Sequence, residues 1–289
     1  MRDYILREVT IDYSQAHISR REALRRLGLL GLSAAGATTL LAACGGGGSQ
    51  ESQRTTTTKP KAAPSAPSAR DITFDGPNGE LFGTFAAAPD PRGAVLVIHE
   101  IFGLNAHIKS IPPRFAADGY SALAIDLLSE EGGTEAVGDN AVGAVGAAPS
   151  DRMIADLRAG LDELEQRVPD VRLAVVGFCF GGGMTWRLLD AGEPRLAVAV
   201  PFYGPAPADA DFSESDAAVL AIYGENDDLA NSSRDSVIAA LETAGLTHQV
   251  KTFAGAGHGF FNDTSPRYHE AAATEAYALV LDWFAEHLD

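Results

Sequence analysis

Hydrophobic residues from position 71 onward fall into short runs separated by longer amphipathic stretches. A run of this kind has the length of a β-strand, and a run without polar interruption is typical of a strand covered on both faces of a sheet. We expect strands at residues 72–74, 81–87, 94–98, 121–125, 173–176, 196–200, 219–223 and 248–253. The first two should pair as a hairpin, because the turn sequence Gly76-Pro77-Asn78-Gly79 joins them.

Helical periodicity fills most of the intervals between these strands. After a candidate N-cap at Ser150, apolar residues recur every three or four positions at Ile154, Leu157, Leu161, Leu164 and Val168. Helices are also expected at residues 105–118, 233–244 and 266–288. Strands alternating with helices at this spacing predict an α/β fold, with one mostly parallel sheet and helices on both faces.

Two stretches interrupt this regular pattern. Pro112 and Pro113 should make the helix at 105–118 irregular. Residues 130–148 are rich in glycine and show no periodicity, so we expect a loop there. Residues 71–289 as a whole are expected to form a single domain, because their number suits one hydrophobic core.

The first 44 residues have a pattern typical of an export signal. Arg20 and Arg21 precede a mildly apolar run at residues 27–43, which is short for a membrane span. The run ends in Leu41-Ala42-Ala43-Cys44, which resembles a lipobox, where cleavage leaves Cys44 as a lipidated N-terminus. We therefore expect a twin-arginine lipoprotein signal at residues 1–44, and an uncleaved N-terminal anchor is the alternative.

Residues 45–70 consist mainly of Gly, Ser, Thr, Pro and Ala and show no apolar periodicity. Such a segment buries too little apolar surface to fold, so we expect a disordered tether. The signal and the tether together predict a lipoprotein in the cell envelope, held to the outer face of a membrane only by the lipid on Cys44.

Acidic residues dominate the chain that remains after the signal. The full sequence has 22 Lys and Arg against 39 Asp and Glu, and residues 1–44 carry six of the former and four of the latter, which leaves a net charge of −19. This charge argues against nucleic acid and anionic lipid surfaces as partners, and a solvated acidic surface explains it. If Cys44 is lipidated, Cys179 is the remaining thiol, so neither a disulfide nor a zinc-type cluster is expected.

Residues 173–184, LAVVGFCFGGGM, hold the most informative motif in the chain. A short apolar strand runs into the turn Gly177-Phe178-Cys179-Phe180-Gly181, which is a nucleophile-elbow pattern with cysteine in the serine position. Glycine neighbours are needed because the nucleophile occupies a strained turn where strand and helix approach closely. The N-terminus of the following helix should lower the pKa of the thiol. On this motif alone, a small buried hydrophobic residue is an equally good interpretation of Cys179.

Two later loops supply partners for a cysteine nucleophile. The sequence Gly224-Glu225-Asn226-Asp227-Asp228 follows one expected strand, and Gly255-Ala256-Gly257-His258-Gly259-Phe260 follows the next. Reactive groups gather at the carboxyl ends of strands in such sheets, and hydrolases built on them have the order nucleophile, acid, histidine. His258 would accept the thiol proton and Asp227 would fix its tautomer, with Asp228 as the alternative acid. Histidines without comparable context, expected to be structural or exposed, are His99, His107, His248, His269 and His287.

A third loop, His99-Glu100-Ile101-Phe102-Gly103-Leu104-Asn105, places a carboxylate directly after the strand at 94–98. With HEIFGLN, GFCFGG, GENDD and AGHGF in these positions, residues 71–289 resemble the dienelactone hydrolase family, cysteine hydrolases of the α/β-hydrolase fold. The resemblance implies that Cys179 is the nucleophile and that Asp227 and His258 complete the triad. It also implies that Glu100 contacts the resting thiol and helps to deprotonate it, and that the backbone amides of Ile101 and Phe180 form the oxyanion hole.

The expected activity is hydrolysis of a small-molecule ester or lactone through an acyl-enzyme on Cys179, without a cofactor or metal ion. Dienelactone hydrolases hold a substrate carboxylate with arginines, but residues 129–150 contain no Lys or Arg and the four residues after His258 carry no cation. Neutral apolar substrates are therefore expected unless Arg152 or Arg267 reaches the site. The expected pocket residues are Phe102, Tyr203, Phe260 and Phe261. The alternatives are a thioesterase or peptidase on the same fold, or a binding lipoprotein without catalysis.

Overall fold

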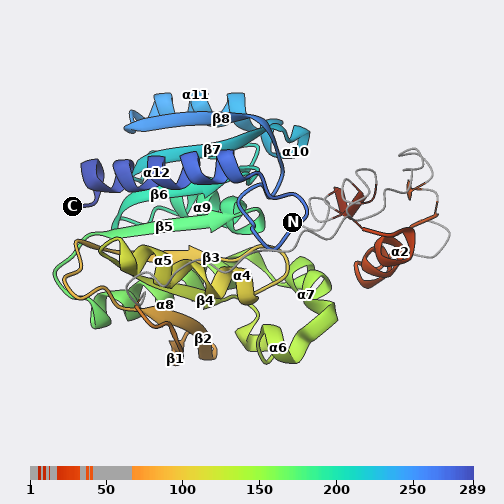
Figure 1. Ribbon diagram of the computed structural model, residues 1–289, viewed down its shortest axis with the longest axis horizontal. Coiled ribbons are helices and arrows are strands. Elements are labelled where there is room, and N and C mark those ends of the chain that lie inside the picture. The colour runs from red at the N-terminus through yellow and green to blue at the C-terminus, as the bar shows by residue number, and fades with distance from the viewer. Residues whose placement is uncertain are drawn as a thin grey trace, which may run out of the picture.

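The computed structural model describes residues 6–7, 9–10, 13, 18–32, 37–38, 40–41 and 67–289. Within these residues, one eight-stranded sheet forms the centre of the molecule, in the order β1-β2-β4-β3-β5-β6-β7-β8 (Figure 1). The strands are β1 (Arg70–Gly76), β2 (Gly79–Ala86), β3 (Gly93–Ile98), β4 (Tyr120–Asp126), β5 (Leu173–Phe178), β6 (Leu196–Phe202), β7 (Ala218–Asn226) and β8 (His248–Gly257). All eight expected strands are present.

The sheet is mostly parallel, as expected. β1 and β2 form an antiparallel hairpin, in which Gly76 pairs with Gly79, and β2 is also antiparallel to β4. The six strands from β4 to β8 in the sheet order run parallel to one another. Their carboxyl ends therefore lie along one edge, which brings the loops after β3, β5, β7 and β8 together.

Helices cover both faces of the sheet, which explains why β3, β4 and β5 are buried along their whole length. On one face lie α5 (Ile111–Ala117) and α12 (Glu270–His287), and on the other lie α8 (Ser150–Arg167) and α9 (Phe180–Asp190) (Figure 1). Further helices are α4 (Ala106–Lys109), α10 (Asp228–Asn231) and α11 (Arg234–Ala244). Each buried strand thus contacts apolar helix faces on both sides, and this arrangement produces the uninterrupted apolar runs.

The helix expected at residues 105–118 is divided at Ser110 into α4 and α5. Pro112 and Pro113 lie in the first turn of α5, where a helix does not use the backbone N–H that proline lacks. Ser150 is the first residue of α8, and its side chain makes no capping hydrogen bond, so the expected N-cap was wrong; Pro149 occupies that position.

Residues 130–148 are not the loop that was expected. They lie in four short helical elements: η1 (Ser129–Glu131), α6 (Thr134–Val137), η2 (Gly138–Asn140) and α7 (Ala141–Ala147). The carboxylate of Asp126 accepts hydrogen bonds from the backbone N–H and the hydroxyl of Thr134, at 2.7 and 2.8 Å, which holds the start of α6. Val142 and Val145 are buried, but a pattern this short is not detectable as a period.

The described part of the N-terminal segment includes one helix, α2 (Arg20–Leu29), whose first turn is capped by Ser19. This helix lies beside α7 (Figure 1). Cys44 and residues 45–66 lie outside the described residues, so the lipobox and the tether stay predictions. In the described residues, we find no helix with the length and apolar character needed to traverse a bilayer.

Candidate active site

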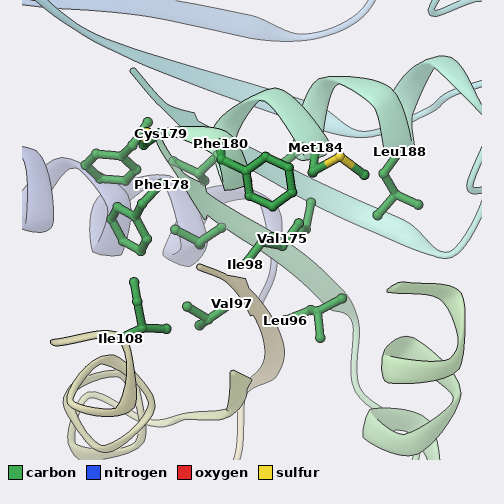
Figure 2. Packing of buried hydrophobic residues seen from close by; sticks show 14 of the residues in the cluster. Leu96, Val97, Ile98, Ile108, Val175, Phe178, Cys179, Phe180, Met184 and Leu188 are labelled. Carbon is green, nitrogen blue, oxygen red and sulfur yellow. The ribbon is translucent and has the colours of Figure 1, made fainter. Parts of the chain in front are cut away.

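Cys179 lies at the junction of β5 and α9 (Figure 2). Its backbone has φ 56° and ψ −114°, in the left-handed region that non-glycine residues rarely adopt. Such a conformation costs about 1–3 kcal/mol and persists only where its surroundings hold it. Two hydrogen bonds do so, because the N–H of Cys179 donates to the Phe202 carbonyl at 3.0 Å and its own carbonyl accepts from Gly183 at 3.0 Å.

The two glycines of the elbow motif are required by close backbone approach. A Cβ at Gly177 would lie 2.0 Å from the carbonyl oxygen of Gly181, and a Cβ at Gly181 would lie 2.3 Å from that of Ile98. No side chain fits at either distance. The backbone at Gly181 therefore packs directly against the end of β3. This contact places the loop that begins at His99 next to the turn that holds Cys179.

Asp227 and His258 come together from the loops after β7 and β8. Oδ2 of Asp227 lies 2.7 Å from Nδ1 of His258, and both side chains are buried. The other oxygen of Asp227 accepts the N–H of Ala230 at 3.1 Å, so the carboxylate is fixed at the start of α10. With Asp227 ionised, Nδ1 carries the ring proton and Nε2 is the basic atom. Asp228 is exposed and begins α10, so Asp227 is the acid that contacts the histidine.

Glu100 is buried at the end of β3, with 5% of its surface exposed. Its Oε2 accepts a hydrogen bond of 2.8 Å from the amide of Asn262. The amide oxygen of Asn262 in turn accepts from Thr264, at 3.0 Å from the backbone and 2.7 Å from the hydroxyl, which fixes its orientation. Asn262 was not expected as a partner of Glu100, which lies 162 positions away in the chain.

His99 is a structural residue that shapes this loop. Its Nε2 accepts the backbone N–H of Leu127 at 3.1 Å, so its Nδ1 carries the proton and donates to the Glu100 carbonyl at 2.6 Å. Burial lowers the pKa of His99, which keeps the ring neutral. The ring of Phe180 stacks on His99 with centroids 5.8 Å apart. Phe180 thus directs its side chain into the core, and as the first residue of α9 it has a backbone N–H that the helix itself does not use.

Three of the four expected pocket residues belong to a buried aromatic cluster. Tyr203, Phe260 and Phe261 are almost fully buried and pack around Phe202. The ring of Tyr203 also packs edge-on against His258, with centroids 5.2 Å apart. Burial raises the pKa of Tyr203, and the neighbouring acidic groups raise it further. Tyr203 therefore joins this aromatic cluster to His258.

Phe102 is half-buried and lines a cavity of 350 Å³ beside the site. Glu100, Asn262 and Arg267 line the same cavity. Arg267 lies three residues before α12, not at its start as expected, and its guanidinium is 3.5 Å from the His258 carbonyl. We call this cavity the entrance cavity; its lining includes residues of the loops after β3 and β8, among them Gly259, which follows His258.

Arg152 does not take part in the site. Its guanidinium lies 2.9 Å from the carboxylate of Glu131 and donates to the Leu127 carbonyl at 2.8 Å. Among the residues that the structure describes, no three His, Cys, Asp or Glu side chains gather in a way that could hold a metal ion.

The structure has the features of an α/β-hydrolase with a cysteine elbow. The sheet is mostly parallel, Cys179 has a positive φ between strand and helix, and an Asp-His pair lies at the same edge of the sheet. Comparison with known proteins gives the family. The family model described as "Dienelactone hydrolase family" matches residues 82–288. The chain belongs to the dienelactone hydrolase family.

Relatives of this family resemble the chain in sequence and in fold. A Salmonella typhimurium protein named "Putative carboxymethylenebutenolidase" is 33% identical over 208 residues, 67% of this chain and 77% of that protein. The crystal structure of a Klebsiella pneumoniae protein titled "Putative Dienelactone Hydrolase" superposes with a TM-score of 0.68 at 27% identity, covering 77% of this chain and 100% of that one. A dienelactone hydrolase-like promiscuous phosphotriesterase from metagenomic libraries gives 0.64 at 25% identity, with 78% and 100% covered. The expected α/β-hydrolase fold is confirmed.

Proposed function

We propose that this protein hydrolyses carboxylic esters or lactones through an acyl-enzyme on Cys179. The observation that carries the proposal is the 2.7 Å contact between His258 and Asp227 at the sheet edge where Cys179 occupies its strained turn. A binding protein has no use for a nucleophile in a costly backbone conformation beside an oriented histidine.

The reaction follows from the roles of these groups. Nε2 of His258 takes the thiol proton, and the thiolate sulfur attacks the carbonyl carbon, whose π electrons move onto oxygen. The amides of Ile101 and Phe180 hold this oxyanion. When the carbon–oxygen double bond re-forms, the alkoxide leaves and takes its proton from His258. Water, deprotonated by His258, then cleaves the thioester in the same way and returns the proton to Cys179.

Esters and lactones are favoured over amides because of the leaving groups. A thiolate leaves more readily than an amine, so a tetrahedral adduct on an amide collapses back to substrate. Acyl-thioesters and peptides remain the alternative substrates on the same site. A panel of p-nitrophenyl esters, lactones, peptides and acyl-thioesters separates them, and we expect the highest kcat/KM among the oxygen esters.

The test of the nucleophile uses residues 67–289, which contain the whole sheet. We expect Cys179→Ala to abolish ester hydrolysis and Cys179→Ser to leave weak activity, since an alcohol is far harder to deprotonate than a thiol. Iodoacetamide should inactivate the enzyme while adding one label, located at Cys179 by mass spectrometry. A labelled protein with full activity would show that another group attacks the substrate.

We further propose that the substrate is neutral. Arg152 is engaged by acidic partners, and the entrance cavity holds the Glu100 carboxylate beside Arg267. A carboxylate entering a partly desolvated site without a dedicated cation costs several kcal/mol, roughly a thousandfold in rate. A neutral ester should therefore have higher kcat/KM than its carboxylate-bearing analogue at the same ionic strength. A preference for the anionic analogue that disappears in Arg267→Gln would instead identify Arg267 as the clamp.

For the location, we propose a lipoprotein whose mature chain begins at Cys44. Three acyl chains on one residue would hold the protein stably in a membrane. The mature protein should partition into detergent and carry the mass of the lipid, whereas Cys44→Ala should leave the precursor uncleaved. A mature form without lipid that begins at another residue would contradict this.

A further inference from the structure

The described part of the N-terminal segment lies across the entrance cavity. Ile18 and Arg26 line this cavity together with Glu100, Phe102 and Arg267. The segment that was interpreted as an export signal is therefore packed, in the full-length chain, against the loops that carry the site. We call residues 18–32 the cap segment.

Arg26 is the central contact of the cap segment. Its guanidinium carbon lies 5.0 Å from the centroid of the Phe102 ring, a cation–π distance. Glu22, one turn earlier in α2, accepts a hydrogen bond from Arg26 at 2.7 Å. Hydrogen bonds from Arg25 and Arg26 lower the pKa of Glu22 to about 2, so the ion pair persists over the physiological pH range. Arg26 is thus oriented by its own helix onto the rim of the cavity.

A second set of contacts lies along α7. The backbone carbonyl of Leu29 comes close enough to Gly143 that a Cβ there would lie 3.3 Å from it. Arg25 reaches the backbone carbonyl of Asp139 at 3.4 Å. Ala23 and Leu27 are completely buried, whereas Leu29 is 39% exposed. One face of α2 is therefore an interface with buried apolar residues.

Other residues of the N-terminal segment share a cavity with the residues after β7. This cavity of 590 Å³ is lined by Leu6, Leu32 and Leu40 of the segment and by Asp228 and Leu229 of α10. Asp228 directly follows the Asp227 that holds His258. The N-terminal segment therefore contacts the loop after β3 through Phe102 and the residues after β4 through Asp139. It also shares cavity walls with residues that follow β7 and β8.

The sheet and the proposed site lie outside this segment. All eight strands and every residue of the proposed mechanism lie between residues 70 and 262. The Klebsiella structure is matched over its entire length by 77% of this chain. On α2 itself, Arg20 and Arg21 are exposed, so this arginine pair remains accessible while Leu27 is buried.

We propose that the cap segment obstructs the active site of the full-length chain and that its removal opens the site. This proposal rests on the proposed hydrolase function only where ester hydrolysis is the quantity measured. Access of a small reagent to the Cys179 thiol is a second readout that requires no catalysis.

The experiment compares full-length proteins, all carrying Cys44→Ser so that Cys179 is the one thiol, with residues 67–289. Leu27→Asp places a charge in the buried face of α2, and Leu29→Asp is the matched control on the exposed face. Arg26→Ala removes the cation from the Phe102 ring, and Arg21→Ala is its matched control. The rate of Cys179 alkylation by iodoacetamide is followed by mass spectrometry, and kcat/KM is measured with p-nitrophenyl acetate.

We expect residues 67–289 and the Leu27→Asp protein to be alkylated at least tenfold faster than the parent full-length chain. Arg26→Ala should give a smaller increase, and both controls should match the parent. Equal alkylation rates in the parent and in residues 67–289 would overturn the proposal, and slower alkylation after release would show that the segment completes the pocket instead. Faster alkylation without ester hydrolysis in any form would support the cap and reject the proposed function.

Discussion

Asp227→Asn is the substitution whose effect can be worked out most fully from the structure. Oδ1 of Asp227 accepts the Ala230 N–H at 3.1 Å, so the Asn carbonyl oxygen should keep that position. The Asn NH₂ group then replaces Oδ2, 2.7 Å from Nδ1 of His258, and donates to it. The ring proton must move to Nε2, which in the proposed mechanism is the atom that accepts the proton of Cys179.

The magnitude follows from the charge that is lost. An imidazolium and a carboxylate with charge centres about 4 Å apart attract by about 4 kcal/mol at an effective dielectric constant of about 20. Removing that attraction raises the barrier to thiolate formation by a similar amount, about a thousandfold in rate, and the wrong tautomer adds to the loss. We expect kcat/KM for a p-nitrophenyl ester to fall by a factor of about 10³–10⁴.

Asp228→Asn is the matched control, because the same chemical change occurs one residue later on an exposed side chain. It should leave kcat/KM within about twofold of the parent enzyme. Stopped-flow release of p-nitrophenol measures acylation directly, and circular dichroism shows whether each variant is folded. If a folded Asp227→Asn enzyme retained more than a tenth of the parent acylation rate, the assignment of Asp227 as the orienting acid would be rejected.

Two further substitutions test the packing and the electrostatics. Gly181→Ala places a methyl group 2.3 Å from the Ile98 carbonyl, so we expect a loss of about 1–3 kcal/mol of stability and about a hundredfold lower kcat/KM. Thermal unfolding measures the stability and the ester assay measures kcat/KM. Gly183→Ala in the same helix is the control and should lose far less of both. Asp156 has a pKa raised to about 6 by burial, so its neutral form is favoured in the folded state and stability is lost as pH rises from about 4 to about 6. The parent protein should therefore have a free energy of unfolding that is lower at pH 7 than at pH 4 by on the order of 2–3 kcal/mol because of Asp156. In Asp156→Asn this contribution should be absent, as measured by urea unfolding at both pH values. An unchanged difference between the two pH values would contradict the raised pKa of Asp156.

The sequence predicts the central strands of the sheet well because these strands are buried on both faces and are apolar at nearly every position. β3 and β5 are examples, and the glycines beside Cys179 specify the turn at the end of β5. The short helices at residues 129–147 were missed because one or two turns contain too few residues to show a period. Helix α7 buries only one narrow face, which local sequence does not distinguish from a glycine-rich loop.

The pairing of Asp227 with His258 was predictable, and the surroundings of this pair were less so. The acid and the histidine each follow a strand, and strand ends in a parallel sheet converge on one edge. Phe102 and Phe261 have the same hydrophobicity, yet one lines a cavity and the other lies in the core, since tertiary packing decides between them. The pairing of Asn262 with Glu100 joins residues 162 positions apart, so no local pattern indicates it.

The order of the strands also determines when the thiol becomes reactive during folding. β5, β6, β7 and β8 are neighbours in the sheet and consecutive in the chain, and His258 follows the last of them. Parallel pairing requires long-range crossovers and is therefore slow. A chain that has paired β5 with β3 already has the turn at Cys179 but lacks His258, the base that we propose for the cysteine. Recovery of thiol reactivity should thus be the last event in refolding, later than recovery of helical circular dichroism, and it provides a kinetic marker for the docking of β8.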